Sequence, residues 1–114
     1  MTPLAQKTYA LLKKVPKGKV TTYKALANAL GTKAYRAIGQ FMRTNPYAPD
    51  VPCHRVVASD GTIGGFMGTT KGSQIQKKKS LLTREGIMFS GNKINDFHNH
   101  LYQFDIYILT NEIL

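Results

Sequence analysis

Two consecutive helices joined by a glycine are the feature that most constrains the fold of this chain. Thr22 can cap a helix that ends at Gly31, since glycine readily adopts the left-handed conformation that closes a helix. Thr32 can then cap a second helix over 33–43, in which apolar residues recur every three or four positions: Ala34, Ala37, Ile38, Phe41 and Met42. Two short helices joined by a tight turn predict a helix-turn-helix unit.

The opposite face of the second predicted helix is polar and basic and carries no acid: Lys33, Arg36, Gln40 and Arg43. A solvated face is the ordinary explanation for such a pattern. Gly39, however, lies within this face, and a glycine inside a helix costs about 1 kcal/mol relative to alanine. Its presence suggests that another body approaches the helix backbone closely, either a nucleic-acid groove or another helix.

The charge balance of the whole chain points the same way. Sixteen Lys and Arg residues stand against six Asp and Glu residues, which gives a formal net charge of +10. This excess suggests a polyanionic partner, nucleic acid first and an anionic membrane surface second, with a merely soluble basic surface as the alternative. No apolar run of about 18 residues is present, and the N-terminus lacks the pattern of a secretory signal. We therefore expect no membrane-spanning segment, and of the two candidates we expect nucleic acid and no membrane as the partner.

The length and the cysteine content further narrow the class of protein that this chain can be. A chain of 114 residues is expected to form one domain. Its single cysteine cannot form an internal disulfide and is too little for a structural zinc site, so we expect a free thiol in a reducing interior, the cytoplasm or nucleoid. His98 and His100 have no further ligands nearby in the sequence, and no metal is expected.

The remaining segments predict a mostly helical α+β domain, a winged-helix-like helix-turn-helix with a short C-terminal β hairpin. Thr2 and Pro3 open a helix that runs to about Lys14. The segment 58–72 is rich in glycine and is read as a short hairpin followed by a loop, and Ser73–Glu85 as a last helix that Gly86 stops. A strand-turn-strand signal surrounds Gly91 and Asn92, and the tail 105–109, Asp-Ile-Tyr-Ile-Leu, favours a strand.

The segment Pro-Cys-His-Arg-Val-Val, residues 52–57, holds the one cysteine. A lone cysteine is more often a small buried apolar residue than a nucleophile. Here, however, His54 and Arg55 supply the cationic group or base that a reactive thiolate needs. A rigid connector with three prolines precedes Cys53 and a glycine-rich loop follows it, which is a way to build a pocket for a planar ligand.

Glu85 is a candidate to orient His54. It is predicted in the last turn of a helix, where the helix dipole disfavours an acid by a few tenths of a kcal/mol, so another task for it is plausible. Adjacent residues of an extended segment point to opposite sides, and a turn or a bridging water would therefore have to connect Cys53 with His54. A histidine adjacent in sequence also argues against a cysteine protease, whose base comes from a distant segment.

Taken together, these motifs resemble the C-terminal domain of the O6-alkylguanine-DNA alkyltransferases. The resemblance runs from about Lys14 to Gly86 and rests on several segments in the same order: TTYKALA, YRAIGQFMRTNP, PCHRVV, SDGTIGGFMG and LLTREG. It implies repair of O6-alkylguanine in double-stranded DNA, without a cofactor and once per molecule. Residues 1–86 would form the DNA-binding and catalytic domain, and 87–114 a β extension that packs on it or leads to another domain.

The resemblance also implies roles for individual residues. Cys53 would accept the alkyl group by direct displacement, and His54 would deprotonate it through a water while Glu85 orients the imidazole. Asn45 would brace the turn that carries the cysteine. Tyr23 would donate a hydrogen bond to the guanine ring and so help the base to leave.

Other implied contacts hold the base and the DNA. The carbonyls of Cys53 and Val56 would accept from the exocyclic amine of guanine, and the backbone N–H of Met67 would face O6, beside an apolar wall from Phe66. The flipped-out nucleotide would be replaced in the stack by Arg36. Further groove and phosphate contacts would come from the rest of the second helix: Lys33, Ala34, Ala37, Gly39 and Arg43.

Some positions depart from the family pattern. Met67-Gly68-Thr69 stands where a Ser-Gly-Gly or Lys-Gly-Gly is common, and Phe66 where tyrosine is frequent. The usual N-terminal domain does not precede this segment, so we expect a minimal enzyme, monomeric, or a piece of a larger fused polypeptide. Two alternatives remain: an alkyltransferase-like protein that binds lesions without repair, in which the acceptor is commonly tryptophan, and a helix-turn-helix regulator.

Overall fold

The computed structural model describes residues 2–65 and 72–104. It has the predicted mostly helical α+β fold. Its elements are α1 (Pro3–Leu12), β1 (Thr21–Thr22), α2 (Tyr23–Ala29), α3 (Tyr35–Arg43), the 3-10 helix η1 (Cys53–Arg55), β2 (Val56–Val57), α4 (Ser73–Arg84), β3 (Phe89–Ser90), β4 (Lys93–Ile94) and α5 (Phe97–His100). None of the described helices is long and apolar enough to cross a bilayer.

Helix α1 begins as predicted. The hydroxyl of Thr2 accepts a hydrogen bond of 3.1 Å from the backbone N–H of Ala5, and Pro3 occupies the first turn, where no N–H is needed. The helix ends at Leu12, two residues earlier than expected. Leu11 and Leu12 are fully buried and anchor α1 in the core.

The helix-turn-helix is formed by α2 and α3. Thr22 caps α2 by accepting from the N–H of Ala25 at 2.9 Å, and Gly31 closes it with φ +67°. Helix α3 begins at Tyr35, later than predicted, because the hydroxyl of Thr32 accepts from the N–H of Ala34 in a local turn. The predicted apolar stripe is buried only in part: Ile38 and Met42 are buried, while Ala34, Ala37 and Phe41 are half-buried.

The strands pair differently from the prediction. In the described part of the expected hairpin, residues 58–65, the chain turns but no pair of strands forms. The N–H of Ala58 donates to the Thr62 carbonyl at 3.0 Å, and Thr62 also forms an isolated antiparallel bridge with Lys93. Strand β2 pairs in parallel with β1, which lies more than thirty residues earlier. The segment 66–71 lies outside the described residues.

The C-terminal part contains the predicted β hairpin. Strands β3 and β4 are antiparallel and turn at Gly91, which has φ +60°. Gly86, at φ +92°, directly follows Glu85, the residue that caps the C-terminus of α4. A small apolar cluster joins this part to the rest of the chain: Val20, Val57, Leu82, Ile87 and Ile94. The predicted strand at 105–109 lies outside the described residues.

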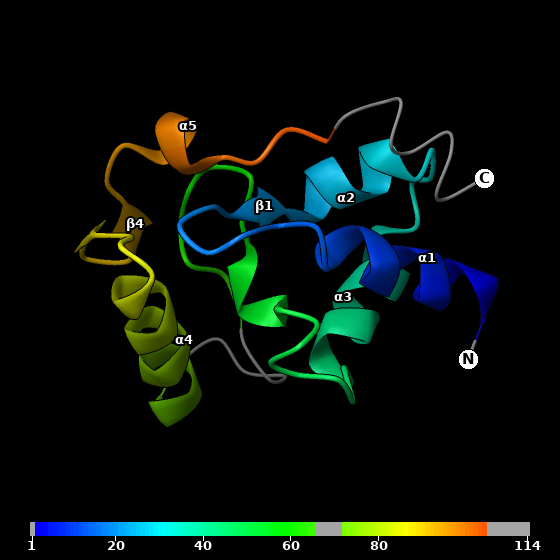
Figure 1. The fold of residues 1–114 in the computed structure, drawn as a ribbon, viewed down its shortest axis with the longest axis horizontal. Coiled ribbons are helices and arrows are strands. Elements are labelled where there is room, and N and C mark those ends of the chain that lie inside the picture. The colour runs from blue at the N-terminus through cyan, green and yellow to red at the C-terminus, as the bar shows by residue number, and fades with distance from the viewer. Residues whose placement is uncertain (1, 66–71, 105–114) are drawn as a thin grey trace.

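The turn that carries Cys53 lies between two groups of helices. In Figure 1, α1, α2 and α3 are on one side of the green segment around residue 55, and α4 with the hairpin is on the other. The main core joins residues of α1, α2 and α3 to this turn, so that Cys53, Leu12, Leu26 and Ile38 belong to one apolar cluster. Helix α4 contacts η1 from the opposite side.

Candidate active site around Cys53

Cys53 opens a tight turn instead of lying in the extended segment that the sequence suggested. Residues Cys53–Arg55 form a 3-10 helix, and the carbonyl of Cys53 accepts a hydrogen bond from the N–H of Val56. The two residues are thus consecutive in a turn, and no direct hydrogen bond joins Cys53 to His54 among the described contacts. The thiol is free and buried, with the residue 4% exposed.

Asn45 fixes the chain just before this turn. Its side-chain amide donates to the carbonyl of Val51 at 2.7 Å, and its Oδ1 accepts from the N–H of Tyr47 at 3.0 Å. The N–H of Cys53 donates to the same Val51 carbonyl at 2.9 Å. Because Asn45 is buried, these bonds are protected from water. They fix the position of Val51, just before Cys53, relative to Asn45 and Tyr47.

Tyr23 approaches the same region from the first turn of α2. It is half-buried and packs against the apolar cluster that contains Cys53. Burial, and to a smaller extent the nearby Cys53, raises the pKa of the Tyr23 phenol. The hydroxyl therefore stays protonated at neutral pH and can donate a hydrogen bond. Gly64, at φ +69°, lies beside the ring, since a Cβ built there would be 3.7 Å from Cε2 of Tyr23.

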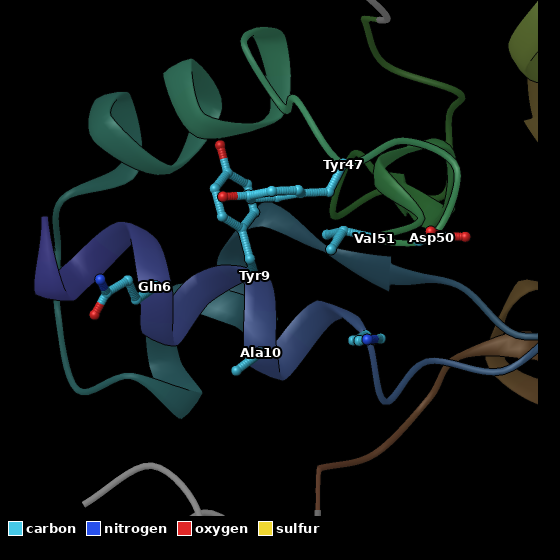
Figure 2. Close-up of a pocket in the computed structure, with 7 residues that line it drawn as sticks. Gln6, Tyr9, Ala10, Tyr47, Asp50 and Val51 are labelled. Atoms are coloured by element: carbon cyan, nitrogen blue, oxygen red, sulfur yellow. The ribbon is translucent and has the colours of Figure 1, made fainter. Parts of the chain in front are cut away.

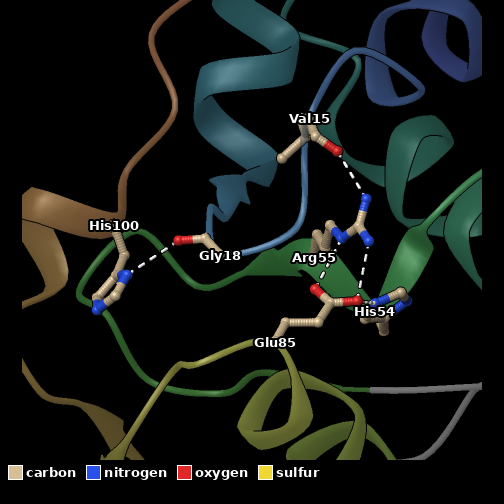
Figure 3. A network of polar contacts seen from close by, with 6 residues as sticks. All are labelled: Val15, Gly18, His54, Arg55, Glu85 and His100. Carbon is tan, nitrogen blue, oxygen red and sulfur yellow. Dashed lines mark hydrogen bonds and ion pairs between the residues drawn. The ribbon is translucent and has the colours of Figure 1, made fainter.

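His54 is buried and paired with Glu85, the residue that caps the C-terminus of α4. His54 is 4% exposed, and its Nε2 lies 2.9 Å from Oε2 of Glu85. Arg55 holds the same carboxylate, with Nε 2.9 Å from Oε1 and Nη2 2.9 Å from Oε2. Figure 3 shows the three side chains converging, with a further hydrogen bond of 2.7 Å from Nη1 of Arg55 to the carbonyl of Val15.

The protonation states in this cluster follow from its contacts. Burial pushes the pKa of Glu85 upward, but the hydrogen bonds from Arg55 and His54 and their charges together outweigh it, so the pKa is lowered. Glu85 is therefore an ionised acceptor, and Nε2 of His54 carries the proton that it accepts. Burial lowers the pKa of His54 despite the bond to Glu85. The imidazole is thus neutral at pH 7, with an unprotonated Nδ1 that makes no hydrogen bond to any described residue.

Lys78 is a site residue that the sequence analysis missed. It is fully buried in α4, and its ammonium donates to three backbone carbonyls, those of Val56 at 2.7 Å, Ile63 at 2.5 Å and Gly65 at 2.8 Å. Burial lowers its pKa to about 7. A signal was present in the sequence, because Lys78 falls in the stripe of α4 between Ile75 and Leu82, where an apolar residue is ordinary.

The predicted base-binding residues are only partly described. Phe66 and Met67 lie outside the described residues. The carbonyl of Val56 is present in the turn, but it already accepts from Lys78, so only its second lone pair is left for a ligand. Within residues 2–65 and 72–104, no three His, Cys, Asp or Glu side chains gather as a metal site would require.

The residues predicted to contact DNA lie on or just before α3. Arg36 and Arg43 are exposed on the helix, and Lys33 is exposed in the turn that precedes it, not in the helix as predicted. Ala37 is half-buried in α3, and Ala34 is half-buried at the N-cap. At Gly39 a Cβ would meet nothing within 4 Å. No described part of the chain therefore requires a glycine there.

A groove lies beside α1. It has a volume of about 370 Å³ and is lined by Gln6, Tyr9, Ala10, Lys13, Tyr47, Asp50 and Val51. Figure 2 shows the rings of Tyr9 and Tyr47 meeting edge to face above α1. Neither Cys53 nor Tyr23 lines this groove, so it is not the predicted base pocket.

Comparison with known proteins identifies the family. Residues 3–87 match the family model described as 6-O-methylguanine DNA methyltransferase, DNA binding domain, and the chain belongs to this family. The methylated-DNA--protein-cysteine methyltransferase of Thermococcus kodakarensis is 49% identical over 88 residues, which cover 76% of this chain and 47% of that protein. The chain thus spans about half the length of the curated relatives that it matches.

Solved structures show the same fold. The Mycobacterium tuberculosis OGT, crystallised in complex with DNA, superposes with a TM-score of 0.64 at 34% identity, covering 75% of this chain and 50% of that one. The S. pombe Atl1, in complex with damaged DNA that contains O6-carboxymethylguanine, has a TM-score of 0.74 at 28% identity and covers 91% of this chain and 98% of its own.

Proposed function

We propose that this protein repairs O6-alkylguanine in double-stranded DNA by transferring the alkyl group to Cys53, once and irreversibly. The observation that carries this proposal is the arrangement around the thiol. A buried cysteine in a braced turn is followed by a neutral histidine whose Nε2 is bound to an ionised carboxylate. In the same core, Tyr23 approaches as a protonated phenol. These are the acceptor, the base and the acid that a displacement at carbon requires.

The chemistry balances without a cofactor. His54 Nδ1 accepts the thiol proton through a water, and the Sγ atom of Cys53 forms a bond to the alkyl carbon as that carbon's bond to O6 breaks. The guanine leaves as an anion that a hydrogen bond from the Tyr23 hydroxyl to its ring stabilises, and the proton taken up by His54 returns through water to neutralise it. Because a thioether is stable, Cys53 is not regenerated and each molecule acts once.

DNA binding is proposed to use α3. The target atom is inaccessible within the duplex, so the nucleotide must be flipped out at a cost of a few kcal/mol. Arg36 would enter the minor groove and fill the vacated space, with Ala34, Ala37 and Gly39 allowing close approach. Lys33 and Arg43 are exposed and would contact phosphates, which position the protein without reading sequence.

The flipped guanine would be held by backbone groups. The carbonyls of Cys53 and Val56 would accept from its exocyclic amine, the N–H of Met67 would face O6, and Phe66 would form an apolar wall. Lys78 supports this proposal indirectly, because it ties the carbonyls of Val56, Ile63 and Gly65 to one point on α4. The base-binding backbone would then be rigid before the base arrives.

The division of the chain into domains, its oligomeric state and its cellular compartment are also proposals. We propose that residues 1–86 form the DNA-binding and catalytic unit and that 87–114 is an extension that packs on it or leads to another domain. The burial of Ile87 and Ile94 in one cluster with Val20 supports packing of the described part of this extension. We propose a monomer in the reducing cytoplasm or nucleoid, where the thiol stays free, either on its own or as part of a fused polypeptide.

A second candidate function is lesion binding without transfer. The likeness to S. pombe Atl1 favours it, since the alignment covers nearly the whole of that chain. The intact Cys53 with its histidine and glutamate favours transfer, because a binding protein has no need of a base beside a thiol.

The fate of the damaged base in the DNA distinguishes the two functions. A duplex with one O6-methylguanine is incubated with excess protein, and its nucleosides are quantified after digestion. We expect the lesion to become guanine, one per protein molecule, with the wild type, and to remain with Cys53→Ser. If the wild type binds the duplex tightly and leaves the lesion intact, the protein is a lesion binder and not a transferase.

A further inference from the structure

Three nitrogens of Arg55 donate hydrogen bonds to two separate segments of the chain, the end of α4 and the residues just after α1. Nε and Nη2 each lie 2.9 Å from an oxygen of Glu85, and Nη1 lies 2.7 Å from the carbonyl of Val15. The side chain is only 12% exposed. Among the described contacts none joins Arg55 to Cys53, so the guanidinium serves the carboxylate and not, as the sequence suggested, the thiol.

The shared carboxylate couples Arg55 to His54. The charged or titratable groups that face His54 are Glu85 at the end of α4, Arg55 in its own turn and Lys78 from α4. Burial is the largest influence against a proton on the imidazole, Glu85 favours one, and Arg55 and Lys78 add smaller contributions against it. Without Arg55, the buried carboxylate would keep His54 as its main partner, and an uncompensated buried anion draws a proton onto such a neighbour.

We propose that Arg55 is a positioning residue that keeps His54 neutral by compensating the charge of Glu85, so that Nδ1 remains free to accept the thiol proton. The inference rests on the proposed function for the role of His54 as base, but not for its protonation state. The guanidinium also fixes where the carboxylate stands, since its third contact ties the cluster to Val15, just after α1.

Lysine is the matched control at this position. Arg55→Lys keeps the positive charge beside Glu85 but cannot make the two parallel bonds and the contact to Val15 together. Arg55→Gln removes the charge and keeps an amide donor for Glu85 or Val15. The two variants therefore separate the charge of Arg55 from its geometry.

The experiment is an NMR titration of the His54 imidazole in the wild type, Arg55→Gln and Arg55→Lys. We expect the wild-type pKa of His54 to lie below the ordinary value of about 6.5. In Arg55→Gln it should rise by about 1 unit, as the loss of a compensating charge predicts, while Arg55→Lys stays close to the wild type. Should Arg55→Gln fail to fold, Arg55→Met, which keeps the apolar stem, replaces it.

Alkyl-transfer rates provide the second readout. At about pH 6.5 Arg55→Gln should transfer up to about fivefold more slowly than the wild type, and the deficit should shrink as the pH rises, because deprotonation restores the base. A purely structural role would slow transfer equally at every pH. A wild type that transfers nothing would overturn the proposed function alone, since the titration still decides the role of Arg55.

Two results would overturn the inference. One is a His54 pKa that is the same in Arg55→Gln as in the wild type. The other needs no variant at all: a wild-type His54 that titrates above about 6.5 is not held neutral by its surroundings.

Discussion

Helices α3 and α4 are both rich in basic residues, but only α4 buries one of them. On α3, Arg36 and Arg43 are exposed. On α4, the central residue of three consecutive lysines, Lys78, is fully buried and bound to three carbonyls, while Lys77 beside it is exposed. Arg36 and Arg43 are therefore available to a partner, whereas Lys78 is used to hold the fold together.

The difference shows why net charge alone does not define a binding surface. The excess of +10 predicts a polyanionic partner for the chain as a whole, but it does not say which cations remain free. Lys78 and Arg55 are committed to carbonyls and to Glu85. The exposed residues of α3 have no such internal partner of opposite charge among the described ion pairs. Variants of the two helices should therefore behave differently.

The largest effect is expected from Lys78→Met. This change leaves three buried carbonyls without their donor, and each unsatisfied group costs about 1–3 kcal/mol, so we expect a loss of about 3 kcal/mol or more in the free energy of unfolding. The matched control Lys77→Met should change it by less than about 0.5 kcal/mol. Urea denaturation measures both, and equal losses would contradict the buried role of Lys78.

The next largest effect is expected from Arg36→Ala, on DNA and not on stability. Without a side chain to fill the stack, base flipping loses part of its compensation, and affinity for a lesion-containing duplex should fall by about tenfold, or roughly 1–2 kcal/mol. Lys33→Ala should cost only about twofold, as a single phosphate contact does. Fluorescence of a base analogue opposite or beside the lesion reports flipping, and the same loss in both variants would count against the stacking role.

Gly39→Ala should separate stability from binding. Its Cβ would meet nothing within 4 Å, so the fold should gain about 0.5–1 kcal/mol from the better helix former. If the glycine is there for close approach of DNA, binding should weaken at the same time. Thermal unfolding and a DNA titration on one sample test this, and unchanged DNA affinity would show that nothing approaches the backbone at Gly39.

The smallest effect is expected in the salt dependence. Arg43→Gln removes one proposed phosphate contact and should reduce the slope of log affinity against log salt by about 1. Lys77→Gln removes the same charge from α4 and should leave the slope unchanged. The slopes come from DNA titrations at several salt concentrations. Equal reductions would mean that α4 lies against DNA as well.

Local signals in the sequence were enough for much of the fold. The caps Thr2 and Thr22, the stop at Gly31 and the hairpin turn at Gly91 each depend on neighbouring residues only, and each forms as predicted. The fold class is confirmed for this reason. The start of α3 was misplaced because Thr32 has two local hydrogen-bonding options and the sequence does not show which it takes.

The features that the sequence did not predict depend on contacts between distant segments. The parallel pairing of Thr21 with Val56 and the bond from Arg55 to Val15 join residues about 35 to 40 positions apart, and no local pattern encodes them. The pairing of His54 with Glu85 could be predicted because an acid at a helix C-terminus is out of place. Lys78 could have been found by the same reasoning, as a cation in an apolar stripe.

The central claim is that the sulfur of Cys53 ends up holding the alkyl group. Intact-mass measurement followed by peptide mapping, after incubation with O6-methylguanine duplex, tests it most directly. We predict that the protein gains the mass of one CH2 unit, that the gain maps to Cys53, and that Cys53→Ser gains nothing. A wild-type protein that stays unmodified, or one modified at any other residue, would contradict the account.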